Sequence, residues 1–131
     1  MNTKQPKLSV IVVVHNMPEQ ALNTLYSLSA HYQKEVEADD YEVLVVENDS
    51  GDNLDPDTIG QLGDNFSYQL RPDSGVSPAP AINEALSLCR ADHVGLLIDG
   101  ARMLTPRVIQ YALEGLSIAG AIVAVPGYYL T

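Results

Sequence analysis

The sequence has 131 residues, of which 46% are hydrophobic and 18% charged, and this is an ordinary globular composition. Its net charge is −10 with only seven Lys and Arg, which excludes the basic face that a nucleic-acid-binding protein needs. A single cysteine, Cys89, excludes an internal disulfide and a cysteine-rich zinc site. The apolar runs are far shorter than the roughly 18 residues that cross a bilayer, and we recognise no leader, so we expect a cytoplasmic protein without a membrane segment.

The first predicted element is a buried strand. Leu8–Val14 is a continuous apolar run that ends at His15-Asn16. Pro18 and Glu19 then predict the start of a helix, because proline fits the first turn and an acid there suits the helix dipole. This helix is expected to end near residues 31–33 and to bury Ala21, Leu22, Leu25 and Leu28.

The middle of the chain predicts a second and a third strand. The charged segment 34–40 is expected to be a loop, and Tyr41–Glu47 has the β-branched composition of a strand buried on both faces. Residues 55–57 carry a helix cap signal, followed by a short helix that ends near Gly63. The alternation of apolar and polar residues over Phe66–Leu70 predicts an outer strand of the sheet.

The last part of the chain repeats this alternation of strand and helix. Residues 77–80 lead into a helix whose inward face is expected to hold Ile82, Ala85, Leu86 and Cys89. Val94–Ile98 predicts a fourth strand, and Thr105-Pro106 is expected to cap a fourth helix. The inward residues of that helix are Val108, Ile109, Ala112, Leu113 and Leu116, and Ala121–Val125 predicts a fifth strand.

This order predicts an α/β fold in three layers, with a mainly parallel, Rossmann-like sheet and helices on both faces. We expect one domain over residues 1–131. In a doubly wound sheet the chain runs outward over the first strands and then crosses back, which places strand 94–98 beside strand 8–14. The chain ends soon after the fifth strand, so we expect the N-terminal part of a longer protein.

Polar residues follow three of the predicted strands: His15-Asn16, Glu47-Asn48-Asp49 and Asp99. Ligands of open α/β sheets bind at the carboxyl ends of the strands, and two acids there suit a nucleotide. One carboxylate can accept from a base or ribose, and another can hold a divalent cation. The alternatives are a solvated turn at Asp49 and a structural role for His15. Arg71 can also reach a ligand, although a loop arginine is more often solvated.

Four segments in this order resemble the nucleotide-binding part of a family 2 glycosyltransferase with the GT-A fold. They are Ser9–Asn16, Glu42–Asp52, Gly75 with Asn83 and Ala85, and Leu96–Ala101. The resemblance implies a nucleoside diphosphate sugar as donor, with UDP-sugar as the usual choice. It also implies an acceptor hydroxyl on a glycan, lipid or protein.

The resemblance implies that Glu47 contacts the nucleobase or ribose. The implied nucleotide-binding residues are Val14, His15, Asn16, Glu47, Asn48, Asp49, Asn83, Asp99 and Arg102. The chain departs from the family in keeping only the asparagine of the Pro-Thr-Tyr-Asn motif after the first strand. It also carries Ile82 where the family often has an arginine.

The largest departure is in the Asp-x-Asp motif, through which the family holds Mg²⁺ or Mn²⁺ against the diphosphate. Here the motif reads Asp99-Gly100-Ala101, so the metal is expected on Asp99 alone, with waters and phosphate oxygens completing its shell. Arg102 can instead neutralise the phosphates, or be a surface arginine near a helix start. No residue matches the family's catalytic base, so we expect donor binding but no sugar transfer by this chain alone.

Three other classes of protein are alternatives to a glycosyltransferase. A GT-A-like domain that has lost its metal and acts as a binding or scaffold module is favoured by the loss of the second acid. A nucleotidyltransferase typically has a glycine-rich, basic loop after the first strand, and residues 15–19 contain neither Gly nor Lys. A receiver-like regulatory domain needs clustered aspartates after the first strand, which this chain does not have.

Overall fold

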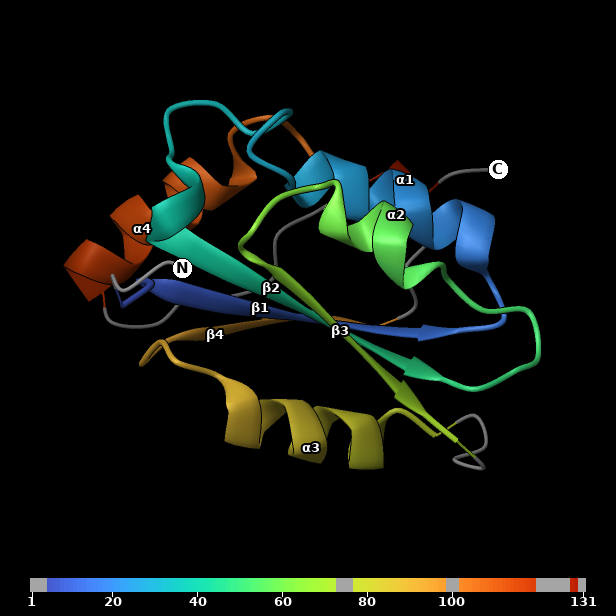
Figure 1. Ribbon diagram of the computed structural model, residues 1–131. Coiled ribbons are helices and arrows are strands. Elements are labelled where there is room, and N and C mark those ends of the chain that lie inside the picture. The colour runs from blue at the N-terminus through green and yellow to red at the C-terminus, as the bar shows by residue number, and fades with distance from the viewer. Residues whose placement is uncertain (1–4, 73–76, 99–101, 120–127, 130–131) are drawn as a thin grey trace.

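The computed structural model describes residues 5–72, 77–98, 102–119 and 128–129. Its centre is a sheet of four parallel strands in the order β3-β2-β1-β4 (Figure 1). These strands are β1 (Leu8–His15), β2 (Tyr41–Asn48), β3 (Phe66–Arg71) and β4 (Val94–Ile98). The prediction of a parallel α/β sheet with the fourth strand beside the first is therefore confirmed.

The two central strands are almost completely buried. Val12 in β1 pairs with Val45 in β2 on one side and with Leu97 in β4 on the other. A strand with neighbours on both sides and helices on both faces has no solvent-facing row, so its sequence is apolar without alternation. The outer position of β3 is confirmed as well, because its residues alternate between partly buried and exposed along most of the strand.

Helices cover both faces of the sheet (Figure 1). Residues of α1 (Pro18–Leu28), α2 (Pro56–Gly60) and α4 (Val108–Ala119) share one apolar cluster with Val10, Val12 and Val14 of β1. The helix α3 (Ala79–Leu88) packs on the other face, where Ala81 and Ala85 join Ile11, Val13 and Val46. Successive strand residues point to opposite faces, so each central strand supplies both clusters.

The helix α1 ends earlier than predicted, at Leu28 instead of residues 31–33. Ser29 has an extended backbone, and its hydroxyl donates to the carbonyl of Tyr26 at 2.7 Å. Serine competes in this way for backbone groups that a continuing helix would use. The next residues form a turn in which Gln33 N–H donates to Ser29 O, so the apolar spacing alone overestimates the helix.

A buried glutamine in this turn joins α1 to the start of α4. The side-chain amide of Gln33 donates to the carbonyls of Ser27, at 2.7 Å, and Thr105, at 2.8 Å. Its oxygen accepts from the N–H of Ile109 at 3.1 Å. All three bonds satisfy backbone groups near helix ends, and such groups are costly to bury unpaired.

The inward face predicted for α3 is wrong at Leu86, which is 47% exposed. The helix contacts β1 and β2 through its smallest residues, Ala81 and Ala85, so its axis lies over those strands. Leu86 consequently projects past the contact. For α4 the predicted residues do face the core, with Val108 and Ile109 buried and the others packed against the cluster.

Three short elements were not predicted. A 3₁₀ turn, Ala38–Asp40, lies within the expected loop, and β5 (Arg102–Met103) pairs antiparallel with β6 (Tyr128–Tyr129). The predicted strand at residues 121–125 lies outside the described residues. Within the described ranges, no helix has the length and apolar character that crossing a membrane requires.

Candidate functional site

The carboxyl ends of β1 and β2 lie side by side at one edge of the sheet, with His15 paired to Asn48. The strand order reverses here, since the chain runs outward from β1 through β2 to β3 and returns to β4 on the opposite side of β1. Ligands of open α/β sheets bind in the crevice at such a reversal. The predicted polar residues after the first two strands therefore meet where a ligand is expected.

Three polar side chains form a row across this edge, on the face that α3 covers. His15 is two residues beyond Val13, and Asn48 two beyond Val46, and both valines belong to the α3 cluster. Arg71 pairs with Asn48 in the register between β2 and β3. Because side chains alternate along a strand, His15, Asn48 and Arg71 stand on the same face of three neighbouring strands.

Hydrogen bonds connect this row to α3. The Nδ1 atom of His15 lies 3.1 Å from the carbonyl oxygen of Asn48, and the side-chain amide of Asn48 donates to the carbonyl of Ser77 at 3.0 Å. Arg71 donates through Nη1 to Oδ1 of Asn48 at 3.4 Å and through Nε to Glu84 at 2.5 Å. The asparagine is fully buried in this network.

Glu47 points to the opposite face and is also fully buried. Its Oε1 accepts hydrogen bonds from the N–H of Leu54, at 2.9 Å, and the hydroxyl of Tyr68, at 2.5 Å, while Oε2 has no partner within the described residues. The pKa of Tyr68 is raised, mainly by burial of its hydroxyl and secondly by the hydrogen bond to Glu47. Glu47 thus supports the loop after β2 from beneath, and its side chain is not at the surface.

The loop after β2 is a tight turn organised by Asp49. Its Oδ1 accepts from the N–H of Gly51 at 2.9 Å and from the side-chain amide of Asn53 at 2.8 Å. These bonds, that from Asn53 most of all, lower the pKa of Asp49. Gly51 has φ +85°, a conformation that side chains rarely adopt. The turn that the sequence allowed is present, and it lies at the edge of the candidate site.

The other predicted site residues lie in different surroundings. Val14 is fully buried in the core and Asn16 is exposed with φ 55°, in the turn that follows β1. Asn83 is exposed on α3. Asp99 lies outside the described residues, as does the side chain of Arg102, whose backbone belongs to β5. Of the predicted site residues, His15, Asn48 and Asp49 therefore lie together at this edge, where Glu47 contributes only its backbone.

The described part of the chain holds no group of three or more His, Cys, Asp or Glu that suits a metal ion. At this edge the carboxylates of Glu47 and Asp49 already accept hydrogen bonds from protein groups. The prediction of a metal ion on Asp99 concerns a residue outside the described ranges.

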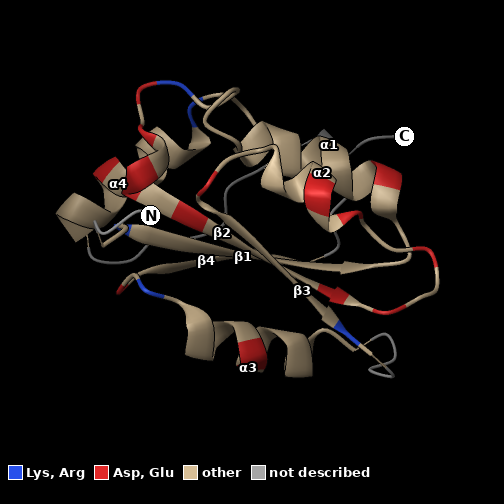
Figure 2. Cartoon of the chain, viewed as in Figure 1, with Lys and Arg blue, Asp and Glu red and all other residues tan. Residues whose placement is uncertain are grey.

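Sequence reasoning undervalued the residues that β3 contributes. Arg71 belongs to the strand and not to a solvated loop, and Tyr68 reaches Glu47 from the other face. Figure 2 shows the basic residue at the end of β3 beside the acidic end of β2. The available signal was the alternation in residues 66–71, which places Tyr68 and Arg71 on opposite faces of the outer strand.

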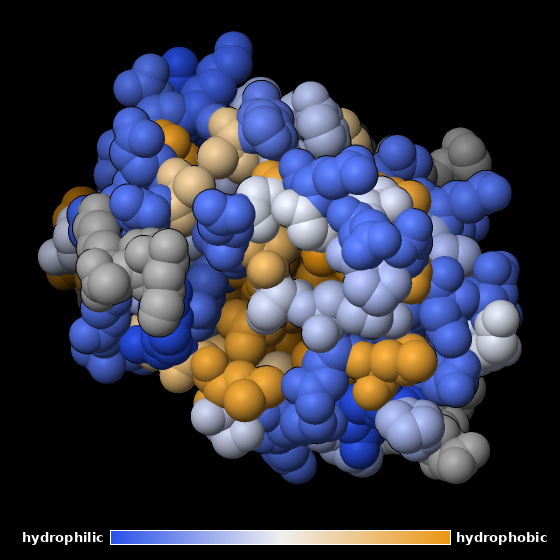
Figure 3. Space-filling view, in the orientation of Figure 1, coloured by the Kyte–Doolittle hydropathy of each residue, from blue (hydrophilic) through white to orange (hydrophobic). Residues whose placement is uncertain are grey.

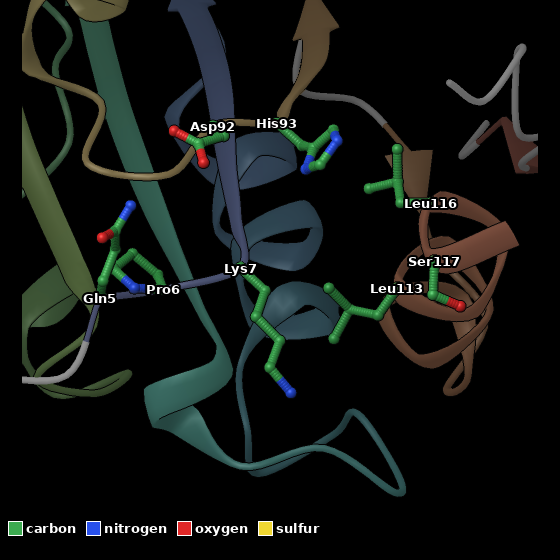
Figure 4. A pocket seen from close by; sticks show the side chains of 8 residues that line it. All are labelled: Gln5, Pro6, Lys7, Asp92, His93, Leu113, Leu116 and Ser117. Carbon is green, nitrogen blue, oxygen red and sulfur yellow. The ribbon is translucent and has the colours of Figure 1, made fainter. Parts of the chain in front are cut away.

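A groove of about 440 Å³ lies at the opposite edge of the sheet (Figure 4). The residues just before β1 and β4 supply Lys7, Asp92 and His93, and α4 supplies Leu113 and Leu116. Because it is formed near the amino ends of the strands, this groove is separate from the candidate site.

Comparison with known proteins does not assign a family: no protein-family model matches the chain, and a search of curated proteins finds no match. The candidate site is therefore supported by its position in the fold and by the chemistry of its residues.

Proposed function

We propose that this chain is the donor-binding part of a glycosyltransferase that transfers a sugar from a nucleoside diphosphate sugar, such as a UDP-sugar, to an acceptor hydroxyl. The supporting observation is that His15, Asn48 and Asp49 lie together at the strand-order reversal. The order of the sequence motifs resembles that in family 2 glycosyltransferases, and this resemblance implies the substrate class.

The diphosphate of the donor needs a positive partner, because the protein has a net charge of −10. A Mg²⁺ or Mn²⁺ ion held by Asp99 would supply it and would stabilise the leaving diphosphate as a Lewis acid. The guanidinium of Arg102 is the alternative, since it can bind phosphate oxygens in pairs. The chain's own role is to bind and orient the nucleotide, and the catalytic base remains unassigned.

Calorimetric titration of UDP and GDP, first with Mn²⁺ and then with EDTA, tests this proposal. Metal-dependent binding that disappears in Asp99→Ala supports a donor site based on one carboxylate. The matched control is Asp64→Ala, which removes an exposed acid from the turn before β3 and is expected to leave binding unchanged. Binding that survives EDTA but is lost in Arg102→Ala, and not in Arg107→Ala, assigns the phosphates to Arg102.

A second candidate is a GT-A-like binding module without catalysis. Besides the replacement of the second acid by Ala101, an apolar surface favours it: Val94, Leu96 and Ile98 of β4 are 42%, 46% and 47% exposed. Figure 3 shows apolar side chains that reach the surface near α3. Large exposed apolar patches mark interaction surfaces. Absence of nucleotide binding with and without Mn²⁺ favours this candidate over the enzyme.

A further inference from the structure

We infer that the free edge of β3 binds an extended, basic peptide segment of a partner protein, which adds to the sheet as a further strand. Among the described strands, β3 is the last on its side of the sheet, with β2 as its neighbour on the other side (Figure 1). This surface runs along the outer strand, whereas the candidate site lies at the carboxyl ends of β1 and β2. The inference therefore does not depend on the proposed function.

Alternate residues of β3 direct their backbone groups toward the free edge. The carbonyls of Asn65 and Arg71 accept from backbone N–H groups in β2 and directly after it, at 2.9 and 3.1 Å. Backbone groups of successive strand residues point to opposite sides, so the odd-numbered residues bond to β2. The N–H and C=O groups of Tyr68 and Leu70 consequently point away from β2. An added strand binds to backbone groups of this kind.

The strand lacks the features that usually protect an edge. Natural edge strands carry proline, lysine, inward charges or a bulge, each of which hinders pairing. The segment Phe66–Arg71 contains neither proline nor lysine, and its register with β2 continues without a bulge. Its one charged side chain, Arg71, stands at the end of the strand and donates through Nε to Glu84 at 2.5 Å. The middle of β3 is therefore open to pairing.

The charge around β3 favours a basic partner. From Glu42 to Cys89 the sequence has nine Asp and Glu and one Arg. Asp57 on α2, which packs against β3, and Asp64 in the turn before β3 are both exposed. Figure 2 shows acidic residues on α2 and on α3, on either side of the strand. A second copy of the chain would bring the same acidic surface to the edge, so repulsion disfavours it as the occupant.

Fluorescence anisotropy of a labelled peptide of about seven residues, in which Val and Lys alternate, tests the inference on the full chain. We expect it to bind about 10-fold or more tightly than the same peptide with Glu in place of Lys. Methylation of its backbone nitrogens should weaken binding by about 10-fold, because the charge remains and the donors are lost. Equal binding of any two of these peptides, or no binding at about 1 mM, would overturn the inference.

Hydrogen exchange of the β3 amides locates the bound peptide. With saturating peptide, exchange at the N–H groups of Tyr68 and Leu70 is expected to slow by about 10-fold or more. Ser67 and Gln69, whose N–H groups face β2, should change little. Slowing only in other segments contradicts the inference. Slowing at Tyr68 and Leu70 that rises with chain concentration in the absence of peptide shows that a second copy occupies the edge, and it contradicts the inference as well.

Leu70→Lys places a positive charge at the edge and keeps the backbone groups, at a position that is 39% exposed. Repulsion is expected to weaken binding of the Lys peptide by about 3-fold or more. The matched control is Ile118→Lys, which changes the net charge equally at an 86% exposed position of α4 and should bind like the wild type. Equal weakening in both variants would mean that only the net charge matters and would overturn the inference. The exchange measurement uses the wild-type chain and so remains decisive if Leu70→Lys folds poorly.

Discussion

The hydroxyl of Tyr68 donates a 2.5 Å hydrogen bond to Oε1 of Glu47, which joins β3 to β2 beneath the candidate site. The same oxygen accepts from the N–H of Leu54, the residue that ends the loop organised by Asp49. A single carboxylate oxygen therefore connects the outer strand to the loop after β2. The position of that loop at the site depends on a side chain that is itself fully buried.

Tyr68→Phe removes one donor from this carboxylate without changing the packing of the ring. We expect the free energy of unfolding to fall by about 1 to 2 kcal/mol, because a hydrogen bond to a charged group is lost in a partly buried position. Urea denaturation at neutral pH measures this change. The control is Tyr111→Phe on α4, where the ring is 59% exposed and the expected change is close to zero. Equal effects of the two substitutions would mean that the bond to Glu47 adds no stability.

The strands of the sheet could be predicted from the sequence because the composition of each short segment indicates a strand. The apolar runs 8–14 and 41–47 are too short for helices and too continuous for half-exposed strands, so they indicate central strands. The reversal that places β4 beside β1 followed from the general behaviour of doubly wound sheets. These two steps also predicted that the polar residues after β1 and β2 lie at one edge of the sheet, where His15 pairs with Asn48.

The contacts within the site could not be predicted, because they depend on which face each side chain occupies and on what packs there. The sequence Glu47-Asn48-Asp49 reads as three neighbouring polar residues, yet the first two are fully buried on opposite faces of the sheet. The role of Arg71 depends on its register with Asn48, which joins residues 23 positions apart. Likewise, Leu86 is exposed because α3 lies over β1 and β2, a placement that helical spacing does not determine.

Glu42 forms a second buried carboxylate site at the opposite edge of the sheet. It accepts from the Ser9 hydroxyl at 2.6 Å and from the backbone N–H and Nε of Arg90 at 2.8 and 3.0 Å. Glu42→Ala removes the acceptor of the buried Ser9 hydroxyl and of the Arg90 backbone N–H, while the 48% exposed Arg90 side chain can bind water instead. We therefore expect a loss of about 1 to 3 kcal/mol in the free energy of unfolding.

The exposed ion pair between Lys7 and Asp40 provides the contrast for Glu42. These groups are 3.8 Å apart and the Lys7 side chain is 64% exposed, so Lys7→Ala is expected to cost less than about 1 kcal/mol. Chemical denaturation of both variants in the same buffer measures the difference. A loss in Glu42→Ala no larger than that in Lys7→Ala would contradict the role given to Glu42.

Tyr41 is expected to make the free energy of unfolding decrease in alkaline solution. Its hydroxyl donates to the carbonyl of Leu28 at 2.6 Å, and burial raises its pKa from an ordinary value of 10.0 to about 12. The folded state therefore keeps a proton that the unfolded state loses, so the contribution is complete below pH 10 and is lost as pH rises toward about 12. Tyr68 has a raised pKa as well and adds to the same decline.

Tyr41→Phe separates the contribution of this hydroxyl from that of Tyr68. At neutral pH the variant is expected to lose about 1 kcal/mol with the bond to Leu28, and above pH 10 its stability should fall less steeply than that of the wild type. Denaturation curves between pH 8 and about 12 measure both effects. Tyr26→Phe, at an exposed position of α1, is the matched control and should retain the wild-type slope. An unchanged slope in Tyr41→Phe would contradict the burial of this proton.

Protonation of Asp49 in acid is expected to weaken the turn after β2. Hydrogen bonds from Asn53 and from the N–H of Gly51 lower its pKa below the ordinary value near 3.9. A lowered carboxyl pKa contributes stability that is present above the unfolded value and is lost as pH falls through the folded one. The turn is therefore expected to remain intact at neutral pH and to open only in strong acid.

NMR titration of the Asp49 side-chain carboxyl carbon tests this dependence directly. The midpoint should lie below that of an unstructured aspartate, and Asn53→Ala should raise it, because Asn53 gives the largest of the lowering effects. The matched control is Asn23→Ala, which removes an exposed asparagine from α1 and should leave the midpoint where it is. If Asn53→Ala leaves the midpoint unchanged, the hydrogen bond from Asn53 does not lower the pKa of Asp49, and the loop is held by the Gly51 N–H and by Glu47.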